Sequence, residues 1–211
     1  MNTLHKVLLF LSAVLLINFV GMDNVKCMEN SNTFTERYYL NDKINVKYPE
    51  FVINDQKIGL EKVNNKVRGI ADKFIKDMGK DATVVTAQMG YDIHYLDENI
   101  CSFTINTYVF QGGAHGVSEL KGYNYNVKTG EEIVFIKMFD FRPSQINKSI
   151  FTKAKADKLS LFDSFKGIEE YPQNFYLLDA KTPIIIFQQY EIAPYSAGII
   201  KVPIMEEVDH I

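Results

Sequence analysis

The residues with the clearest chemical potential surround one histidine near the middle of the chain. Gly112-Gly113-Ala114-His115-Gly116 has three glycines in five positions, which is typical of positive φ angles or of a backbone that a ligand or another segment approaches closely. Three interpretations of His115 stay open: a hydrogen bond that pins neighbouring loops, a position on a ligand-facing surface, or a general base. The stretch lacks the Lys-Ser/Thr pair of a phosphate loop.

A polar and aromatic stretch near the C-terminus, Tyr190–Gly198, is the second candidate. Its carboxylate, Glu191, either accepts hydrogen bonds from backbone N–H groups or has a raised pKa that suits acid–base work. Five tyrosines would suit a glycan- or protein-binding surface if they are exposed, and half-buried aromatic residues of a sheet are the alternative: Tyr108, Tyr123, Tyr125, Tyr190 and Tyr195. A glycosidase would need a second carboxylate at a defined separation. The available ones are Asp92, Asp97, Glu119 and Asp140.

Signatures of metal, cofactor or nucleic-acid binding are weak. HExxH, CxxC and GxSxG patterns are absent. Asp92 and His94 alternate along one run and could touch a metal, but this spacing is common by chance, so we expect no metal and no cofactor. The formal net charge is −3 without a basic cluster, which argues against nucleic acid as a partner.

The N-terminal segment has the composition of an export signal. His5 and Lys6 precede the mostly apolar run Val7–Val20, which is shorter than the ~20 residues that span a bilayer. We predict a signal peptide at 1–27 with cleavage after Cys27. Lipidation of Cys27 and retention as an uncleaved anchor are the alternatives. The expected location is secreted or cell-envelope associated, with membrane contact only if the segment is uncleaved or lipidated.

Regular elements must position the two candidate loops. Apolar residues recur at three- and four-residue steps over 63–78, which predicts an amphipathic helix. Thr83–Leu96, Ile100–Phe110 and Glu119–Val127 have strand-like alternation, which predicts an antiparallel meander. Cys101, the single cysteine after residue 27, falls on the apolar side of its run. We expect an inert core thiol without a disulfide, a reactive thiol being the alternative.

The second half of the chain repeats this mixture of elements. A helical region is expected to begin at Pro143, a residue suited to the first helical turn. Strands are predicted at Phe175–Leu178, Ile184–Gln189 and Ile199–Ile204. The fold class is therefore α+β, with antiparallel sheets, two packed helical segments and two small sub-domains.

The predicted boundaries are a linker at 28–41, a first sub-domain at 42–116 and a second at 117–207. Loops gather at the ends of a folded-back sheet, so His115 is expected to contact Glu191 or Tyr195. A carboxylate partner would raise the pKa of His115 above ~6.5. Such a pair would act as a structural clasp.

Three separated stretches resemble the RsiV/PdaC-type tandem of small extracellular domains: Tyr108–Gly116, Tyr123–Gly130 and Tyr190–Gly198. The resemblance covers roughly Ile44–Met205. In RsiV-like proteins the extracellular domain binds lysozyme, and these proteins also carry a sigma-binding segment and a membrane helix. In PdaC-like proteins a deacetylase domain follows the tandem. Since this sequence has neither addition, we expect a free-standing, exported binding module.

The resemblance implies a cell-envelope module that binds rather than catalyses, with a lysozyme-like wall hydrolase or the peptidoglycan glycan as partner. The alternatives are a glycan-active hydrolase, which would use Glu191 and a second carboxylate, and an accessory wall protein. The expected binding residues are Gly112, Gly113, His115, Tyr190, Glu191 and Tyr195.

Overall fold

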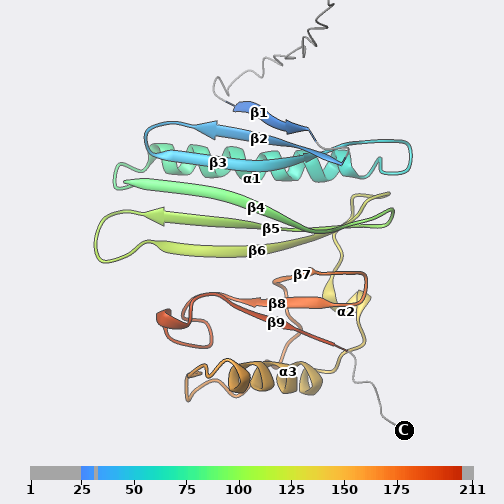
Figure 1. Cartoon of the computed structure of the whole chain (residues 1–211), viewed down its shortest axis with the longest axis vertical. Helices are drawn as coiled ribbons and strands as arrows, with labels where there is room; N and C mark the ends of the chain where they lie inside the picture. Colours follow the sequence, from blue (N-terminus) through green and yellow to red (C-terminus); the bar gives the residue numbers. More distant parts are fainter. Residues whose placement is uncertain (1–24, 31–32, 206–211) are drawn as a thin grey trace, which may run out of the picture.

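Two β-sheets and the helices around them form the described part of the chain, residues 25–30 and 33–205 of a computed structural model (Figure 1). The first sheet has the strand order β1-β2-β3-β4-β5-β6 and the second has the order β7-β8-β9. In chain order the elements are β1 (Val25–Asn30), β2 (Phe34–Leu40), β3 (Ile44–Phe51), α1 (Leu60–Lys80), β4 (Thr86–Leu96), β5 (Ile100–Phe110), β6 (Val117–Asn126), α2 (Phe135–Met138), α3 (Pro143–Ala156), β7 (Phe175–Leu177), β8 (Pro183–Phe187), the 3-10 turn η1 (Tyr195–Ala197) and β9 (Ile200–Pro203).

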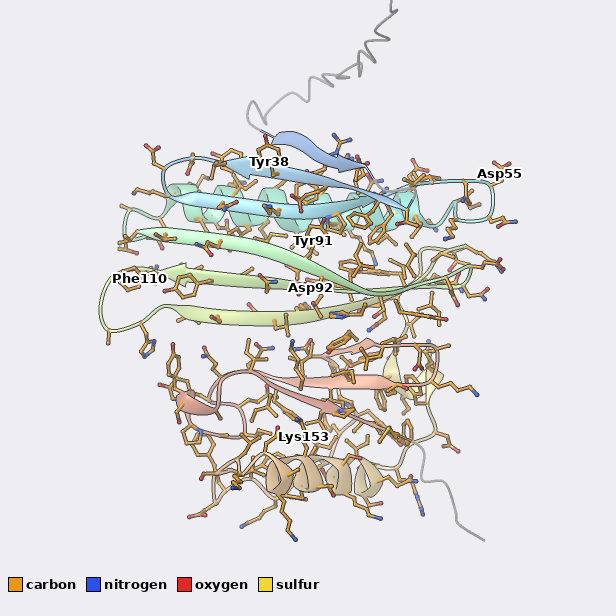
Figure 2. The ribbon with its side chains drawn as sticks, in the orientation of Figure 1. Tyr38, Asp55, Tyr91, Asp92, Phe110 and Lys153 are labelled. Carbon is orange, nitrogen blue, oxygen red and sulfur yellow. The ribbon has the colours of Figure 1, made fainter. Side chains whose placement is uncertain are left out.

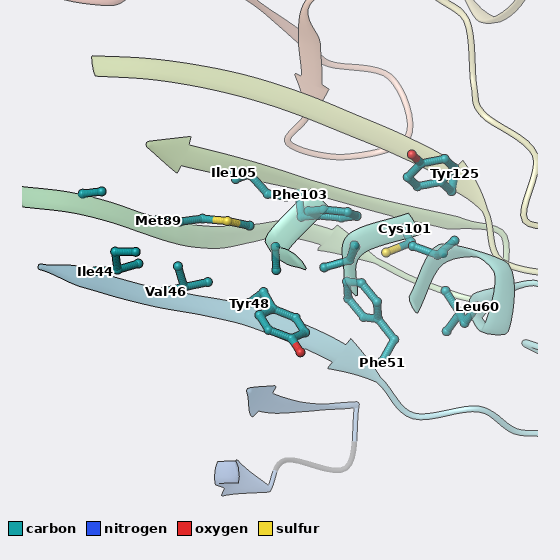
Figure 3. Close-up of a cluster of buried hydrophobic side chains, with 14 of the residues drawn as sticks. Ile44, Val46, Tyr48, Phe51, Leu60, Met89, Cys101, Phe103, Ile105 and Tyr125 are labelled. Carbon is teal, nitrogen blue, oxygen red and sulfur yellow. The ribbon is translucent and has the colours of Figure 1, made fainter. Parts of the chain in front are cut away.

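Helix α1 covers one face of the first sheet because its apolar residues fall on one side of the helix. Leu60, Val63 and Val67 are buried on that side, against the strand residues shown in Figure 3. The buried amide of Asn64 bonds both backbone groups of Phe51, with N···O distances of 2.8 and 2.9 Å. This pair anchors the helix to the end of β3, and each buried leucine or valine adds about 1.5–3 kcal/mol of apolar burial.

The predicted α+β fold with two sub-domains is confirmed. The helix expected over 63–78 is α1, and the expected meander is β4-β5-β6. One pair differs from the antiparallel expectation: β3 and β4 run parallel. The reason is the connection, since a helix between two strands returns the chain to run in the same direction.

The second sub-domain packs helix α3 against the sheet β7-β8-β9 (Figure 1). Helix α3 begins at Pro143 as predicted, and it buries Ile146 and Ile150. These side chains belong to a core that includes Leu177, Ile185 and other residues of the small sheet. Each sub-domain therefore has its own apolar core, and a third buried cluster joins Leu120 of β6 to Tyr176, Ile184 and Ile186 of the small sheet.

Regular strands occupy the predicted linker and begin at the predicted sub-domain boundary. The 28–41 segment holds the end of β1 and all of β2, and β2 pairs with β3 from Phe34↔Phe51 to Leu40↔Asn45. The predicted boundary between residues 116 and 117 falls at the start of β6. Strand β6 pairs with β5 along its whole length and so completes the first sub-domain.

The predicted signal peptide lies mostly outside the described residues. Residues 1–24 are not described, whereas Val25–Cys27 form the beginning of β1, in which Val25 pairs with Tyr39. Cleavage after Cys27 would therefore remove the first half of this strand. The predicted core position of Cys101 is confirmed, because the residue is a fully buried free cysteine in the first core. Burial raises the pKa of its thiol.

Candidate functional site

The loop between β5 and β6 uses its glycines for two different reasons. Gly112 and Gly113 have φ angles of 91° and 96°, where L side chains are strained, and a Cβ at either position would meet no other atom. Gly116 is needed for close approach instead. A Cβ there would lie 2.4 Å from the ring of Tyr108, so the ring lies directly over this glycine.

His115 reaches the second sub-domain and stacks on Tyr195 of η1. The ring centroids are 4.1 Å apart and the planes are inclined by 24°. The Nδ1 atom of His115 lies 3.1 Å from the carbonyl oxygen of Gly116. The predicted contact with Tyr195 is confirmed, while the hydrogen bond of the Glu191 carboxylate goes to the backbone of Gln188. The contact is thus an aromatic stack rather than a carboxylate clasp.

Tyr190 extends this stack outward from a strained backbone conformation. Its ring centroid is 5.6 Å from that of Tyr195, and the side chain is 59% exposed. Its φ angle is +64°, which is uncommon for a residue other than glycine, asparagine or aspartate. The turn is held by Gln188 N–H, which donates to Glu191 Oε2 at 2.6 Å, and by Glu191 N–H, which donates to Gln188 O at 3.2 Å. We call His115, Tyr195 and Tyr190 the aromatic cluster.

Two side-chain amides bind the backbone of β6 and thereby hold the second sub-domain against the first. Gln188 Nε2 donates to Leu120 O at 2.7 Å, and Leu120 N–H donates to Gln188 Oε1 at 3.1 Å. Asn174 Nδ2 also donates to Leu120 O, and Gly122 N–H donates to Asn174 Oδ1. The amides thus satisfy edge-strand groups that would otherwise need another strand. Because Gln188 lies two residues before Tyr190, its contact also positions the aromatic cluster.

A buried polar network joins the sub-domains beneath these amides. Ser102 Oγ donates to Asn124 Oδ1 at 2.7 Å and accepts from Leu177 N–H at 2.8 Å. Asn124 Nδ2 donates to Phe175 O at 2.8 Å. The backbone also approaches closely here, since a Cβ on Gly122 would lie 1.9 Å from Phe175 O. The junction therefore holds the His115 loop and the Tyr195 turn in a defined relative position.

His94 occupies a separate position at the same junction. It is the extra residue where the pairing of β4 with β5 is irregular, and such bulges redirect a side chain. Its ring stacks on Tyr176 at a centroid distance of 3.8 Å, and its Nε2 lies 2.9 Å from Thr104 Oγ1. Burial lowers the pKa of His94, although the Asp92 carboxylate acts in the opposite direction. Within the described ranges, no group of three or more His, Cys, Asp or Glu residues is arranged to hold a metal ion.

The carboxylates considered as partners for Glu191 are dispersed over the first sub-domain and the connection that follows it. Asp97 is in the turn between β4 and β5, at the end of β5 opposite to the His115 loop. The eleven residues of β5 place these two ends roughly 33 Å apart at ~3.3 Å per residue. Asp97 is therefore not a partner for chemistry at the aromatic cluster, and it instead accepts hydrogen bonds from Asn99 N–H and Ile100 N–H.

Sequence reasoning missed the side chains that support the aromatic cluster. Tyr108 was among the candidate surface tyrosines, but alternation alone does not reveal that its ring covers Gly116. Gln188 and Asn174 had none, because a lone amide in a turn is ordinary in any sequence. Their role comes from meeting the edge of β6, which lies more than fifty residues earlier in the chain.

Two family models match the chain in succession. One described as Deacetylase PdaC matches residues 35–118, and one described as Protein of unknown function (DUF3298) matches residues 137–205. The first model ends at the start of β6. No helix of the described residues is long and apolar enough to cross a membrane.

A solved structure shares the fold. A crystal structure of a DUF3298 family protein from Pseudomonas aeruginosa PAO1 is similar with a TM-score of 0.57 at 14% identity, over 87% of this chain and 91% of that one. A DUF3298 family member from Bacteroides fragilis has a TM-score of 0.49 at 16% identity, over 75% and 79% of the two chains. A comparison with curated proteins found no match. The resemblance to the tandem is confirmed in its order of domains, since a PdaC model over residues 35–118 is followed by a DUF3298 model over residues 137–205.

Proposed function

We propose that this protein is an exported, non-catalytic binding module of the cell envelope, and that the aromatic cluster contacts its target. PdaC-type domains are generally extracytoplasmic, which supports the location. The expected binding residues Gly112, Gly113 and His115 lie in one loop, and that loop meets the segment that carries the remaining three.

The observation that carries the proposal is the exposed, strained position of Tyr190. An αL conformation costs a residue with a Cβ about 1–2 kcal/mol. Because Tyr190 is 59% exposed, burial of its ring offsets little of this cost. Strain that persists without such compensation is concentrated at ligand-binding sites. A tyrosine also suits recognition because it has a large apolar surface and a polar hydroxyl group.

The residues of the aromatic cluster come from both sub-domains, so the cluster forms only when the two sub-domains are held together. His115 comes from the loop between β5 and β6 of the first sub-domain, whereas Tyr190 and Tyr195 come from the second sub-domain. Neither sub-domain alone would form the stack. The buried network at Ser102 and Asn124 then acts as the rigid support that a preorganised binding surface needs.

The partner follows from the family resemblance, which implies a lysozyme-like wall hydrolase or peptidoglycan. The test is a pull-down of the purified mature chain on insoluble peptidoglycan and on immobilised lysozyme. Tyr190→Gly is the informative variant, because glycine removes the ring and accepts the φ angle without strain. Leu178→Ala is the matched control, since Leu178 is also exposed but follows β7 at the opposite end of the small sheet.

Capture that is lost in Tyr190→Gly and kept in Leu178→Ala is the expected result. Equal capture of both variants would show that the aromatic cluster is not part of the binding surface. Absence of capture on either matrix would overturn the proposed function itself.

An assay of the Glu191→Gln variant distinguishes the binding module from the alternative glycan hydrolase. Its carboxylate holds the turn through Gln188 N–H, and Glu191→Gln keeps an oxygen that accepts this hydrogen bond. Incubation with wall fragments, followed by mass spectrometry of the products, is expected to show no turnover. Turnover that disappears in Glu191→Gln would replace the binding module with a glycan hydrolase.

A further inference from the structure

We propose that the ligand of the aromatic cluster is a linear, uncharged glycan strand, and that this strand continues from the cluster across the part of the first sheet that neither α1 nor the second sub-domain covers. The inference rests on the proposed function and adds to it the chemical class of the ligand and the path that it follows. Figure 2 looks onto this face, with α1 behind the strands.

Strand register identifies the residues on the uncovered face. Val46 and Met89 are paired across β3 and β4 and are buried in the α1 core. Their neighbours Asn45 and Gln88, which are also paired, therefore point to the opposite side. The same row continues through Tyr108, which is paired with Gln88, to Ser118 on β6. Four adjacent strands thus present one continuous row, which we call the polar row.

The amides on this face have unused hydrogen-bonding capacity. Asn45, Gln88 and Asn106 are exposed, and their side-chain amides form no hydrogen bond within residues 25–30 and 33–205. Asn106 lies across Gly90, where a Cβ would be 2.8 Å from its Oδ1 atom. Each amide offers two donors and an acceptor, the combination that hydroxyl and acetamido groups of a sugar require.

Tyr108 joins the polar row to the aromatic cluster. Its ring lies over Gly116, directly after His115 in the chain, and His115 stacks on Tyr195. The path from Tyr108 through Gln88 to Asn45 crosses two strand spacings, or about 10 Å. Beyond His115 the cluster adds centroid separations of 4.1 and 5.6 Å. This elongated strip suits a polymer better than a single sugar.

The charge along the strip favours an uncharged polymer. Lys47 is the cation nearest to the polar row on β3, and its Nζ is 3.1 Å from Glu36 Oε1. Polyanions are held by clusters of unpaired Lys and Arg side chains, and the polar row has none among its members. Amides and tyrosines remain as the recognition groups, and aromatic rings stack on the apolar faces of sugars.

The test compares short and long ligands. Soluble β-1,4-linked N-acetylglucosamine oligomers, a disaccharide and a hexasaccharide, are titrated into the mature chain by calorimetry. The double variant Gln88→Ala/Asn106→Ala is expected to bind the hexasaccharide about tenfold more weakly and to bind the disaccharide as the wild type does. Tyr190→Gly should weaken both. Asn65→Ala is the control, because Asn65 is an exposed amide on α1, the helix on the other face.

Each outcome decides the inference separately from the proposed function. Unchanged hexasaccharide affinity in the double variant, together with loss in Tyr190→Gly, would overturn the path across the sheet and keep the cluster as the binding site. If the protein binds lysozyme but no glycan, and Tyr190→Gly weakens that binding, the glycan ligand is overturned and the proposed binding module stands. If oligomers, peptidoglycan and lysozyme all fail to bind the wild type, both proposals fall.

Discussion

Replacing Ser102 with alanine tests whether the buried polar network holds the two sub-domains together. The hydroxyl is completely buried and serves two partners, Asn124 Oδ1 at 2.7 Å and Leu177 N–H at 2.8 Å. Alanine fits the space but leaves both partner groups without a hydrogen bond. Each orphaned buried group costs about 1–3 kcal/mol. We therefore expect the free energy of unfolding to fall by about 2–4 kcal/mol, a large share of the ~5–15 kcal/mol that stabilises a typical domain.

Urea denaturation of the mature chain measures this loss. With a slope of about 2 kcal/mol/M, the midpoint should fall by about 1–2 M. Ser118→Ala is the matched control, because Ser118 lies on the neighbouring strand β6, is only partly buried, and its hydroxyl forms no hydrogen bond with the residues the structure describes. Its midpoint should match the wild type, since such surface changes cost less than about 0.5 kcal/mol. Equal midpoints for Ser102→Ala and Ser118→Ala would refute the role of the network.

Three further predictions address packing, pH and reactivity. Gly122→Ala places a Cβ against Phe175 O and should cost about 1–3 kcal/mol by overpacking, with faster hydrogen exchange in β7. Gly69→Ala on α1 is the control, because a Cβ there meets no atom and the φ angle is not positive. Equal exchange of β7 in both variants would contradict the prediction. Burial lowers the pKa of folded His94, so the unfolded chain binds its proton first and stability falls as the pH drops below about 6.5. The fall in melting temperature from neutral to mildly acidic pH should be smaller in His94→Gln than in the wild type. An equal fall in both proteins would contradict this role of His94. Burial also raises the pKa of the Cys101 thiol, so alkylation mapped to Cys101 should require unfolding, and labelling of the native chain would show an accessible thiol.

The local elements could be predicted from the sequence because their patterns are short-range. The apolar spacing over 63–78 is a property of one helix, and it located α1 without knowledge of its partner. Alternation gave the bounds of β5 as Ile100–Phe110, and Pro143 marked the first residue of α3. Cys101 was assigned to the core by the same alternation. In each case the information lies within a few residues along the chain.

Tertiary structure alone decided how these elements are combined. The 28–41 segment reads as polar, but β2 forms there because β3 offers it a partner edge. Strand β6 follows a glycine loop that resembled a boundary, yet it pairs with β5, and its outer edge is satisfied by Gln188 and Asn174. These interactions join positions more than fifty residues apart, which no local period encodes.

The candidate site was likewise predicted from the sequence in part and determined by the tertiary structure in part. Residue types and spacing selected His115 and the Tyr190–Gly198 stretch as separate candidates, and the expectation that loops gather at one end of a sheet brought them together. Only the folded chain determined that His115 stacks on Tyr195 while Glu191 holds its own turn. A sequence specifies which side chains are available in a loop, but which of them touch depends on the relative placement of two sub-domains, and that placement is set by the buried contacts between Ser102, Asn124 and the backbone of β7.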